Sequence, residues 1–575
     1  MPIPLPKFTP AALAMSLLAG SATGQARLQT LVLTGEQASG LPEGISYASI
    51  GTLSTAFNNL GNYGFLATLA GDDITSENNT ACFFFADGRS SPLVARTGDP
   101  VPGFSSETYY VEFTSGSVFN INNIGGFTFA ARMEGPDVTS LNDWVAMRSQ
   151  GSSGLQVVAR EGDLAPGFSD GIVLGQPASV GLRDSGQMSL YTTISGPGVT
   201  VSNNYVSFFA FDGVNFVPVV RKGGPAPGLP AGVFLLEIGG AWTNDAGLMR
   251  YSATLGGAGI DFDNDQAYFV GDPDSGFGLA LRTGQQAPGL DPGVLTYPSL
   301  HSVFLDNSGQ LAFLSSLAGP GVTTSNDEAV FNATGDGGVT VIARKGDQAA
   351  GLDSGVVYGD ILSSLVRHNL VNQTAFASYL TGAGVDATNF RGVFGPDGTS
   401  GLVKLIRSGE PVPGLSNSLY SSTPGVSELQ LNQTGQVAAY SGITGGSPGD
   451  GCIVLTGTTN GTVLIAAVGQ TIDVNNDPLV ADMRTISLVS SKFKLNDAGQ
   501  ILFLLKFTDN STGLFLADTS PCIADTNADG VLSPADFSAW VAAFNATAPE
   551  CDQNGDGLCT PADFSAWVAN YNAGC

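Results

Sequence analysis

The stretch Asn58-Asn-Leu-Gly61-Asn-Tyr-Gly-Phe65 decides the fold, because variants of it recur along most of the chain. Its pattern is Asn-x-x-Gly-x-x-small-aromatic, and eight copies or near-copies lie 61 to 64 residues apart. They begin at Asn58, Asn122, Arg183, Asn244, Asp306, Asn369, Asn432 and Asn496. A Gly that ends an apolar segment also occurs eight times, 60 to 64 residues apart, at Gly35, Gly98, Gly162, Gly223, Gly284, Gly346, Gly409 and Gly469. Two independent markers with one period predict a tandem-repeat domain.

Each repeat has the pattern of four strands, and no amphipathic helical period is found among the repeats. In the first repeat the strands are expected at Tyr47–Gly51, Gly64–Leu69, Ala81–Phe85 and Pro92–Arg96. The Asn-x-x-Gly turn tolerates positive φ, and Asp87-Gly88 is typical of a tight hairpin. Four antiparallel strands per repeat predict the blades of a β-propeller.

The two ends of the repeat region complement each other. Leu28–Thr34 has the pattern of a fourth strand but precedes the first turn motif, so it has no blade of its own. The eighth motif is followed by a second strand at Ile501–Leu505 and a third at Gly513–Ala517, but by no fourth strand. We therefore expect Leu28–Thr34 to complete the last blade, which closes a ring of eight and leaves no open sheet edge. An open solenoid is the alternative.

An arginine stands two residues before the terminating Gly in six repeats. These are Arg96, Arg160, Arg221, Arg282, Arg344 and Arg407. Seventeen residues before the first five stand Asn79, Asp143, Asn204, Asp265 and Asp327, which predicts cross-strand hydrogen bonds within each hairpin. A ring of anion-binding arginines is the functional alternative to this structural clasp. We favour the clasp, because a feature copied into every blade usually maintains the fold.

The repeated motif resembles the bacterial choice-of-anchor tandem-repeat proteins named for the NxxGxxAF pattern. The resemblance spans nearly the whole region 27–519. Such proteins carry interchangeable C-terminal anchors, and the resemblance implies no particular reaction.

Two near-identical 12-residue segments at the C-terminus have the ligand spacing of calcium loops. Calcium takes six to eight oxygen ligands, and such a loop supplies them from positions 1, 3, 5, 7 and 12. In the first loop these are Asp525, Asn527, Asp529, the Val531 carbonyl and Asp536; in the second, Asp552, Asn554, Asp556, the Leu558 carbonyl and Asp563. Ser533 and Thr560 at position 9 are additional candidates. The segments predict two Ca²⁺ ions in a module at 520–575, with an acidic surface loop as the alternative.

Each loop is expected to lead into a short helix. Ser533 and Thr560 are candidate N-caps, each followed by Pro at the first helical position. Apolar side chains then recur at i, i+3, i+4 and i+7, and we expect the two stripes to pack on each other as a core. The stripes are Phe537, Trp540, Val541 and Phe544, and Phe564, Trp567, Val568 and Tyr571.

The module resembles dockerin repeats, because position 12 is Asp and no helix precedes either loop. Its closing Gly574-Cys575 resembles dockerin-type anchors that end in Gly-Cys. The resemblance implies surface anchoring, with a cohesin-like partner as the other implied role. Four cysteines in the module allow three pairings. Our hypothesis is Cys522–Cys575 with Cys551–Cys559, whereas Cys82 and Cys452 have the pattern of small apolar residues in strands.

The N-terminus and the composition restrict location and partners. Residues 1–26 have the pattern of a signal peptide, with Lys7, a ten-residue apolar stretch and small residues before a cleavage site. The apolar stretch is too short to span a bilayer, so we expect export to the cell surface or medium without a transmembrane segment. The chain has 22 Lys+Arg against 50 Asp+Glu and a formal net charge of −28, which excludes nucleic acid as a partner.

The sequence offers little catalytic chemistry. It contains two histidines, His301 and His368, in different repeats, so a Ser-His-Asp triad would rest on one of them. The acidic segment Asp261–Asp265 is either a third calcium site or, as we favour, a solvated loop. The favoured hypothesis is a non-catalytic binding or structural protein whose propeller takes a glycan or protein ligand. The alternative is a glycoside hydrolase or polysaccharide lyase in polysaccharide catabolism, because carboxylate pairs are defined by distance in space.

Overall fold

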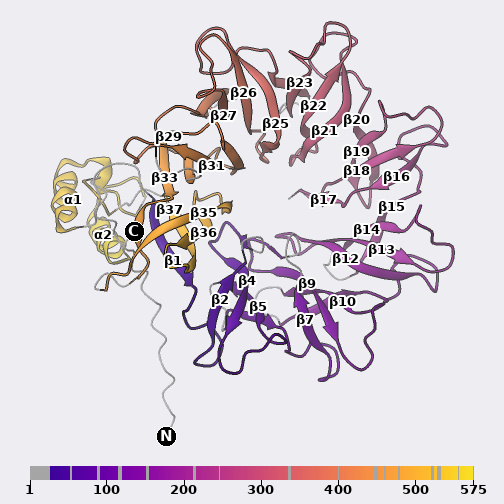
Figure 1. Cartoon of the computed structure of the whole chain (residues 1–575), viewed down its shortest axis with the longest axis horizontal. Helices are drawn as coiled ribbons and strands as arrows, with labels where there is room; N and C mark the ends of the chain where they lie inside the picture. The colour runs from indigo at the N-terminus through magenta and orange to yellow at the C-terminus, as the bar shows by residue number, and fades with distance from the viewer. Residues whose placement is uncertain are drawn as a thin grey trace.

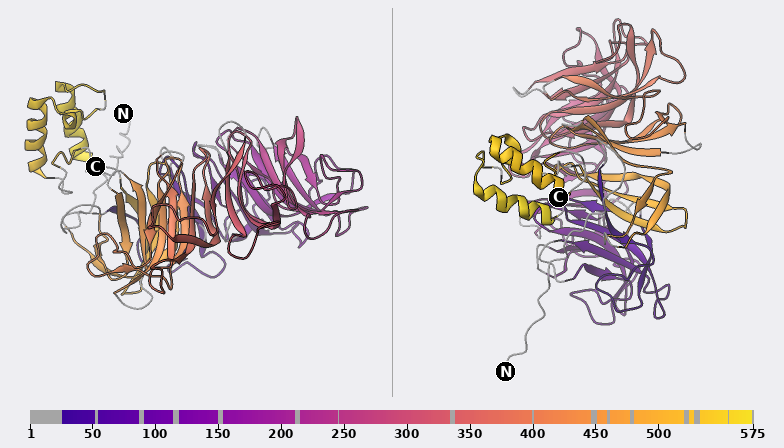
Figure 2. Two further views of the ribbon diagram at one scale, coloured as in Figure 1. Left: turned by 90° about the horizontal axis from the view of Figure 1, so that it is seen from above. Right: turned by 90° about the vertical axis from the view of Figure 1, so that its left-hand side faces the viewer.

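The structure is a computed structural model of the 575-residue chain. It describes residues 26–51, 55–86, 91–113, 119–149, 154–210, 215–244, 246–333, 338–398, 401–445, 451–458, 461–476, 480–519, 524–527, 533–554 and 556–573. The predicted signal peptide up to residue 25, Cys522 and Cys575 therefore lie outside the described part. The described residues form an all-β ring of eight sheets and a small helical module beside it (Figures 1 and 2).

The strands follow the predicted period. Blade 1 has β2 (Ser46–Ile50), β3 (Ala56–Phe57), β4 (Tyr63–Ala70), β5 (Thr80–Phe85) and β6 (Leu93–Arg96). Blade 2 has β7 (Tyr109–Phe113), β8 (Asn120–Ile121), β9 (Phe127–Glu134), β10 (Trp144–Ser149) and β11 (Gln156–Arg160). Blade 3 has β12 (Val173–Leu182), β13 (Met188–Ser195), β14 (Tyr205–Ala210) and β15 (Val217–Arg221). Blade 4 has β16 (Phe234–Ile238), β17 (Trp242–Thr243), β18 (Met249–Gly256), β19 (Gln266–Asp272) and β20 (Gly276–Arg282).

The second half of the ring repeats this order. Blade 5 has β21 (Leu295–Leu305), β22 (Leu311–Ala318), β23 (Glu328–Ala333) and β24 (Val339–Arg344). Blade 6 has β25 (Val356–His368), β26 (Thr374–Gly382), β27 (Arg391–Pro396) and β28 (Leu402–Arg407). Blade 7 has β29 (Leu419–Tyr420), β30 (Val426–Leu431), β31 (Val437–Thr444), β32 (Gly451–Thr458) and β33 (Gly461–Ala467). Blade 8 has β34 (Thr471–Asp473), β35 (Met483–Leu495), β36 (Ile501–Phe507) and β37 (Thr512–Asp518).

The N-terminal strand closes the ring, as the sequence predicts. β1 (Arg27–Leu33) pairs antiparallel with β37, with Leu28 opposite Ala517 and Leu33 opposite Gly513. The blade 8 sheet therefore runs β1-β37-β36-β35-β34. Because its outer strand comes from the other end of the chain, opening the ring requires breaking a strand pair.

The hydrophobic core consists of layers between blades. Each of eight buried clusters in the ring combines side chains of two neighbouring sheets, and the cluster between blades 8 and 1 joins Leu502 and Leu514 to Tyr47 and Phe65. No single blade therefore buries its own faces, and stability depends on completing the ring.

The motif asparagine links the blades to one another. Asn58 accepts hydrogen bonds from the backbone N–H groups of Leu60 and Asn62 in its own turn, at 3.0 and 2.8 Å. Its side-chain amide also donates to the backbone carbonyl of Asn122 in the next blade, at 2.7 Å. The same inter-blade bond is donated by the side-chain amides of Asn122, Asn244, Asn369, Asn432 and Asn496. Asn496 donates to the carbonyl of Asn58 and so joins blade 8 to blade 1. We call this set of bonds the asparagine ring.

The arginine clasp exists, but its predicted partners are wrong. The Nε atoms of Arg160, Arg221, Arg282, Arg344 and Arg407 donate to the backbone carbonyls of Asn142, Asn203, Asn264, Asn326 and Asn389. Each carbonyl is eighteen residues before its arginine, whereas side chains seventeen residues before were expected. The hairpin register places Arg160 opposite Val145 rather than Asp143, and a β-bulge in each of these hairpins accounts for one of the two residues of difference. Arg96 instead contacts Asp99 at 3.5 Å.

The C-terminal module contains α1 (Pro534–Ala546), the 3-10 turn η1 (Pro549–Cys551) and α2 (Pro561–Ala573). Ser533 caps α1 in a capping box with Asp536, as its sequence predicts. The two aromatic stripes face each other, with the ring of Phe537 5.2 Å from Trp567 and that of Trp540 5.5 Å from Phe564. None of the helices in the described part is long and apolar enough to cross a membrane.

Candidate functional site

The two acidic loops of the module precede its two helices, and the second is described nearly in full. Both carboxylate oxygens of Asp552 accept backbone N–H groups, from Asp556 at 3.1 Å and from Gly557 at 2.8 Å. The Asn554 side-chain oxygen accepts the Asp556 N–H, and Asp556 accepts the Leu558 N–H. These bonds hold the oxygens of positions 1, 3 and 5 within one tight turn. Gly557 at position 6 has φ of 81°, in the left-handed region that glycine adopts readily.

The position-12 carboxylates tie each loop to its helix. Asp563 is fully buried and accepts the backbone N–H groups of Gln553, Asn554 and Thr560, at 3.0, 3.2 and 2.7 Å. The N–H of Thr560, followed by those of the loop, holds the pKa of the Asp563 carboxyl below its usual value. Asp536, also fully buried, accepts the Ser533 N–H at 2.7 Å. Both carboxylates therefore lie at the junction of loop and helix.

Two tryptophans fix the starts of the loops, which the sequence did not indicate. Trp567 of α2 donates from Nε1 to the Ala524 carbonyl at 3.2 Å, immediately before the first loop. Trp540 of α1 donates to the Cys551 carbonyl at 3.1 Å, immediately before the second loop. Each tryptophan is at least 95% buried. Each helix therefore positions the start of the loop that precedes the other helix, so the module folds as one unit.

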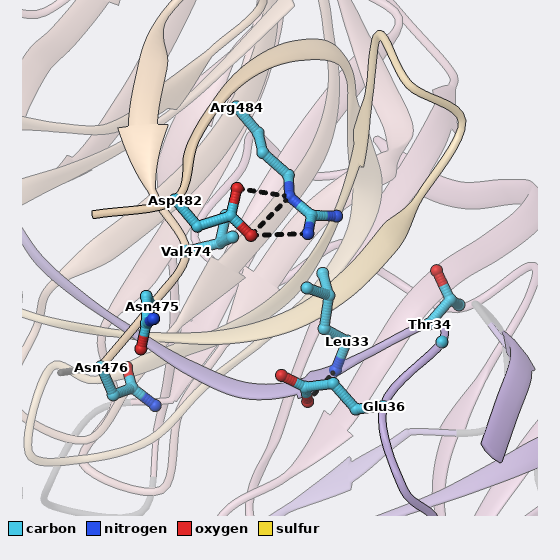
Figure 3. A pocket seen from close by; sticks show the side chains of 9 residues that line it. Leu33, Thr34, Glu36, Val474, Asn475, Asn476, Asp482 and Arg484 are labelled. Atoms are coloured by element: carbon cyan, nitrogen blue, oxygen red, sulfur yellow. Dashed lines mark hydrogen bonds and ion pairs between the residues drawn. The ribbon is translucent and has the colours of Figure 1, made fainter. Parts of the chain in front are cut away.

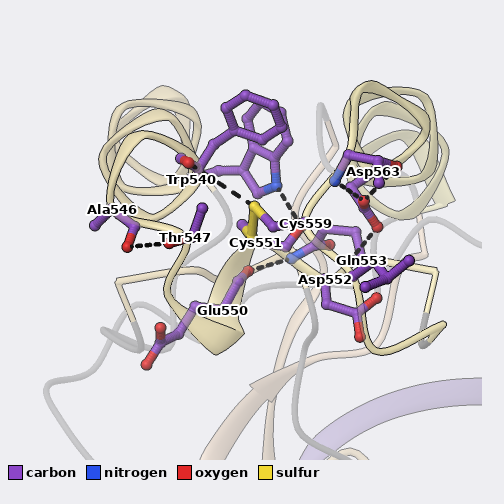
Figure 4. The surroundings of a disulfide bond; sticks show 12 residues. Trp540, Ala546, Thr547, Glu550, Cys551, Asp552, Gln553, Cys559 and Asp563 are labelled. Atoms are coloured by element: carbon purple, nitrogen blue, oxygen red, sulfur yellow. Dashed lines mark hydrogen bonds between the residues drawn. A yellow bond between two sulfur atoms is a disulfide. The ribbon is translucent and has the colours of Figure 1, made fainter.

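A disulfide joins Cys551 to Cys559 across the second loop, with 5.6 Å between the two Cα atoms (Figure 4). This pairing confirms half of the disulfide hypothesis, and the other half, Cys522–Cys575, lies outside the described residues. In the described part of the chain Cys82 and Cys452 form no disulfide and are fully buried, and burial raises the pKa of the Cys452 thiol to about 12. Both are small core residues, as predicted.

The donor set of the loops fits a calcium ion. All candidate side-chain ligands are oxygens, and residues 520–575 contain seven carboxyl side chains without any Lys, Arg or His. An oxygen-only set without basic competitors is what a hard divalent cation requires. Of the first loop, Asp525, Asn527 and Asp536 are described, whereas Asp529 and Val531 lie outside. Within the described residues, no three His, Cys, Asp or Glu side chains converge closely enough to hold a metal, so amide and carbonyl oxygens would have to complete each shell.

The propeller histidines do not form a triad within the described residues. His368 is buried, bonds through Nδ1 to the Thr374 hydroxyl at 2.7 Å, and has a pKa lowered to about 3 by burial. His301 is exposed and lies 3.0 Å from the Ser299 hydroxyl, but neither contact includes a carboxylate. Asp261 accepts from the Asp263 N–H and from the Asn264 amide in an exposed turn. Asp261 and Asp263 of the acidic segment are therefore exposed to solvent.

Comparison with known families gives a match over the propeller. Residues 16–205, 175–410 and 368–521 each match a family of unknown function, DUF7453. The chain belongs to this family. The three matches overlap, which agrees with a domain built from repeats. No curated protein matches the chain.

Solved structures of three carbohydrate-active enzymes resemble this chain only distantly. The periplasmic gluconolactonase PpgL of Pseudomonas aeruginosa has 13% identity and a TM-score of 0.28, covering 71% of this chain and 95% of its own. A PL25 ulvan lyase bound to a GlcA–Rha3S saccharide has 11% identity and a TM-score of 0.25, covering 73% and 92%. The exo-β-1,3-galactanase 1,3Gal43A of Clostridium thermocellum has 12% and 0.25, covering 59% and 82%. Such values carry no inference about activity.

Proposed function

We propose that this protein is an exported, non-catalytic binding protein whose propeller is displayed at the cell surface through a calcium-stabilised C-terminal anchor. The observation that carries the proposal is the charge pattern of the module. Seven carboxyl groups stand without a basic side chain, and two of them, Asp536 and Asp563, are fully buried at the loop–helix junctions. Bound Ca²⁺ would supply the positive charge that the side chains of this acidic module lack.

The first ion would be held by Asp525, Asn527, Asp529, the Val531 carbonyl and Asp536. The second would be held by Asp552, Asn554, Asp556, the Leu558 carbonyl and Asp563. The helices, their tryptophans and the Cys551–Cys559 bridge would then present a rigid module to an anchoring partner. The signal-peptide pattern of residues 1–26 supports export, and a cohesin-like partner is one form that the anchor could take.

The propeller supports a binding rather than a catalytic role. Its repeated polar groups are committed to structure, because the asparagine ring joins blades and the arginine clasps hold loops. The residues that differ between blades are therefore the ones available to recognise a ligand.

Calorimetry of the full-length chain with CaCl₂ tests the calcium proposal. We expect two binding sites, and a melting transition of the module that rises with calcium and falls with EDTA. A ligand at a hundred times its Kd stabilises the folded state by about 2.7 kcal/mol. The double variant Asp552→Asn/Asp556→Asn should lose one site, whereas Glu107→Gln, an exposed propeller carboxylate, should keep both. Absence of calcium-dependent heat, together with an unchanged transition in EDTA, would refute the proposal.

A further inference from the structure

A polar cavity of about 460 Å³ lies where the N-terminal strand closes the ring (Figure 3). It lies between the end of β1, the segment after β34 and the start of β35. Its lining residues are Leu33, Thr34, Gly35, Glu36, Val474, Asn475, Asn476, Asp482 and Arg484. The volume is within the range of about 300–1,000 Å³ that is typical of small-molecule sites.

The cavity belongs to blade 8, which together with blade 7 departs from the repeat at the position of the clasp arginine. In six blades the residue two before the terminating Gly is an arginine, and in five of them its Nε clasps the loop between the second and third strands. In blade 8 this residue is Leu33, and the loop is reduced to a turn at Asp509–Ser511. The closing strand does not need the cavity, because β1 is already paired along its length with β37. Because this cavity lies where the blade departs from the repeat, it is a candidate ligand-binding site.

The positive charge in the cavity is already neutralised. Arg484 donates to both carboxylate oxygens of Asp482, at 2.6 to 3.2 Å, and also contacts Asp509 at 3.2 Å and the Ser511 hydroxyl at 2.7 Å. Glu36 adds a third carboxyl group, and its pKa is raised by burial and, more weakly, by Asp482. The local balance of three carboxyl groups to one guanidinium disfavours an anionic ligand.

The remaining lining groups suit hydroxyl groups. Carboxylate oxygens accept hydrogen bonds, and asparagine amides both donate and accept. Asn476 is committed to the closing strand, because it donates to the Thr30 carbonyl at 2.7 Å and accepts the Thr30 N–H at 3.2 Å. Leu33 and Val474 are the aliphatic members of the lining, and both are buried, so an apolar ligand would gain little contact.

We infer that this cavity binds a small neutral polyhydroxylated ligand, such as one or two sugar units of a glycan, through the carboxyl groups of Glu36 and Asp482. The inference rests on the proposed role of the propeller as a binding platform and names its ligand class. The cavity lies at the Leu33 end of β1, whereas the anchor module follows Asp518, which is paired with Arg27 at the other end. An anchored module would thus leave the cavity on the far side of blade 8.

Gly35→Asn tests the inference, because a Cβ at Gly35 meets open space at the cavity wall and asparagine tolerates the positive φ of 90°. Gly469→Asn is its matched control. Gly469 is the equivalent glycine of blade 7, with φ of 88° and equally open space, but it does not line the cavity. Any strain from the substitution is therefore common to both variants. Titration calorimetry of full-length protein with maltose, cellobiose and lactose, and with digalacturonate and spermidine as charged probes, measures binding.

We expect at least one neutral disaccharide to bind the wild type, with affinity reduced tenfold or more in Gly35→Asn and unchanged in Gly469→Asn. Binding of the charged probes alone, or no binding of the neutral ones, would overturn the inference. Equal affinity in both variants would place the ligand elsewhere. That last result would refute this site but keep the proposed binding function.

Discussion

Removing one member of the asparagine ring should destabilise the whole propeller. Asn432 is 3% exposed and donates to the Asn496 carbonyl of blade 8 at 3.0 Å. It also accepts the backbone N–H groups of Thr434 and Gln436 at 3.2 and 2.8 Å. Asn432→Ala removes these three bonds to backbone groups, and also the side-chain bonds to Gln436 and Thr434, and it leaves the Asn496 carbonyl without this buried donor. At about 1 kcal/mol for each of the three backbone bonds, the expected loss in unfolding free energy is about 3 kcal/mol.

Urea unfolding followed by tryptophan fluorescence measures this loss as a shift of the midpoint at constant slope. Asn307→Ala, an exposed asparagine in the corresponding turn of blade 5, is the control and should change stability by less than about 0.5 kcal/mol. The opposite test adds an asparagine to the ring in a blade that lacks one. Asp306 holds the ring position in blade 5 but has no amide to donate, so Asp306→Asn should add a bond to the Asn369 carbonyl and stabilise by about 1 kcal/mol. A loss for Asn432→Ala no larger than that of Asn307→Ala would refute the role of the ring.

Two further predictions concern the module. Because the pKa of Asp563 is lowered in the folded state, its stabilising effect is present above the ordinary carboxyl pKa of about 3.9 and is lost as pH falls through the folded value. In calcium-free buffer the near-ultraviolet circular dichroism of the module should therefore be lost on acidification below about pH 4, and a profile that Asp563→Asn leaves unaltered would contradict this. Cys551→Ser/Cys559→Ser opens an eight-residue link and should cost the module about 2–3 kcal/mol. Reductant should lower the module's melting temperature more in the wild type than in this variant, which keeps the hypothesised Cys522–Cys575 pair, and an equal response in both would argue against the bridge.

The sequence predicted most of the propeller because its information is local and repeated. Turn residues such as Asn58 and Gly61, and the glycine that ends each fourth strand, act within a few residues of their own position. The orphan strand at the N-terminus was found by counting, since a fourth strand was missing at the other end. The helix caps at Ser533 and the Cys551–Cys559 pair are likewise short-range features.

The errors and omissions concern features that a linear residue pattern does not reveal. The partners of Arg160 and its equivalents were misassigned because the hairpin register, which includes a β-bulge, differs from the expected register by two residues. The bond from Asn432 to Asn496 joins residues 64 apart, and the bond from Asn496 to Asn58 joins residues 438 apart. Neither separation corresponds to the period of a single strand, so the residue pattern of one strand does not predict either bond. The contacts of Trp540 and Trp567 with the loop starts depend in the same way on how two helices face each other.

By itself, then, the sequence determined the number of blades, the strand that closes them and the oxygen-rich loops of the module, because periodicity and turn chemistry are properties of neighbouring residues. The tertiary structure alone decided the asparagine ring, the partners of the arginines and the cavity beside Glu36 and Arg484. These depend on distances between segments that the chain brings together only when the ring closes, and a linear pattern carries no record of those distances.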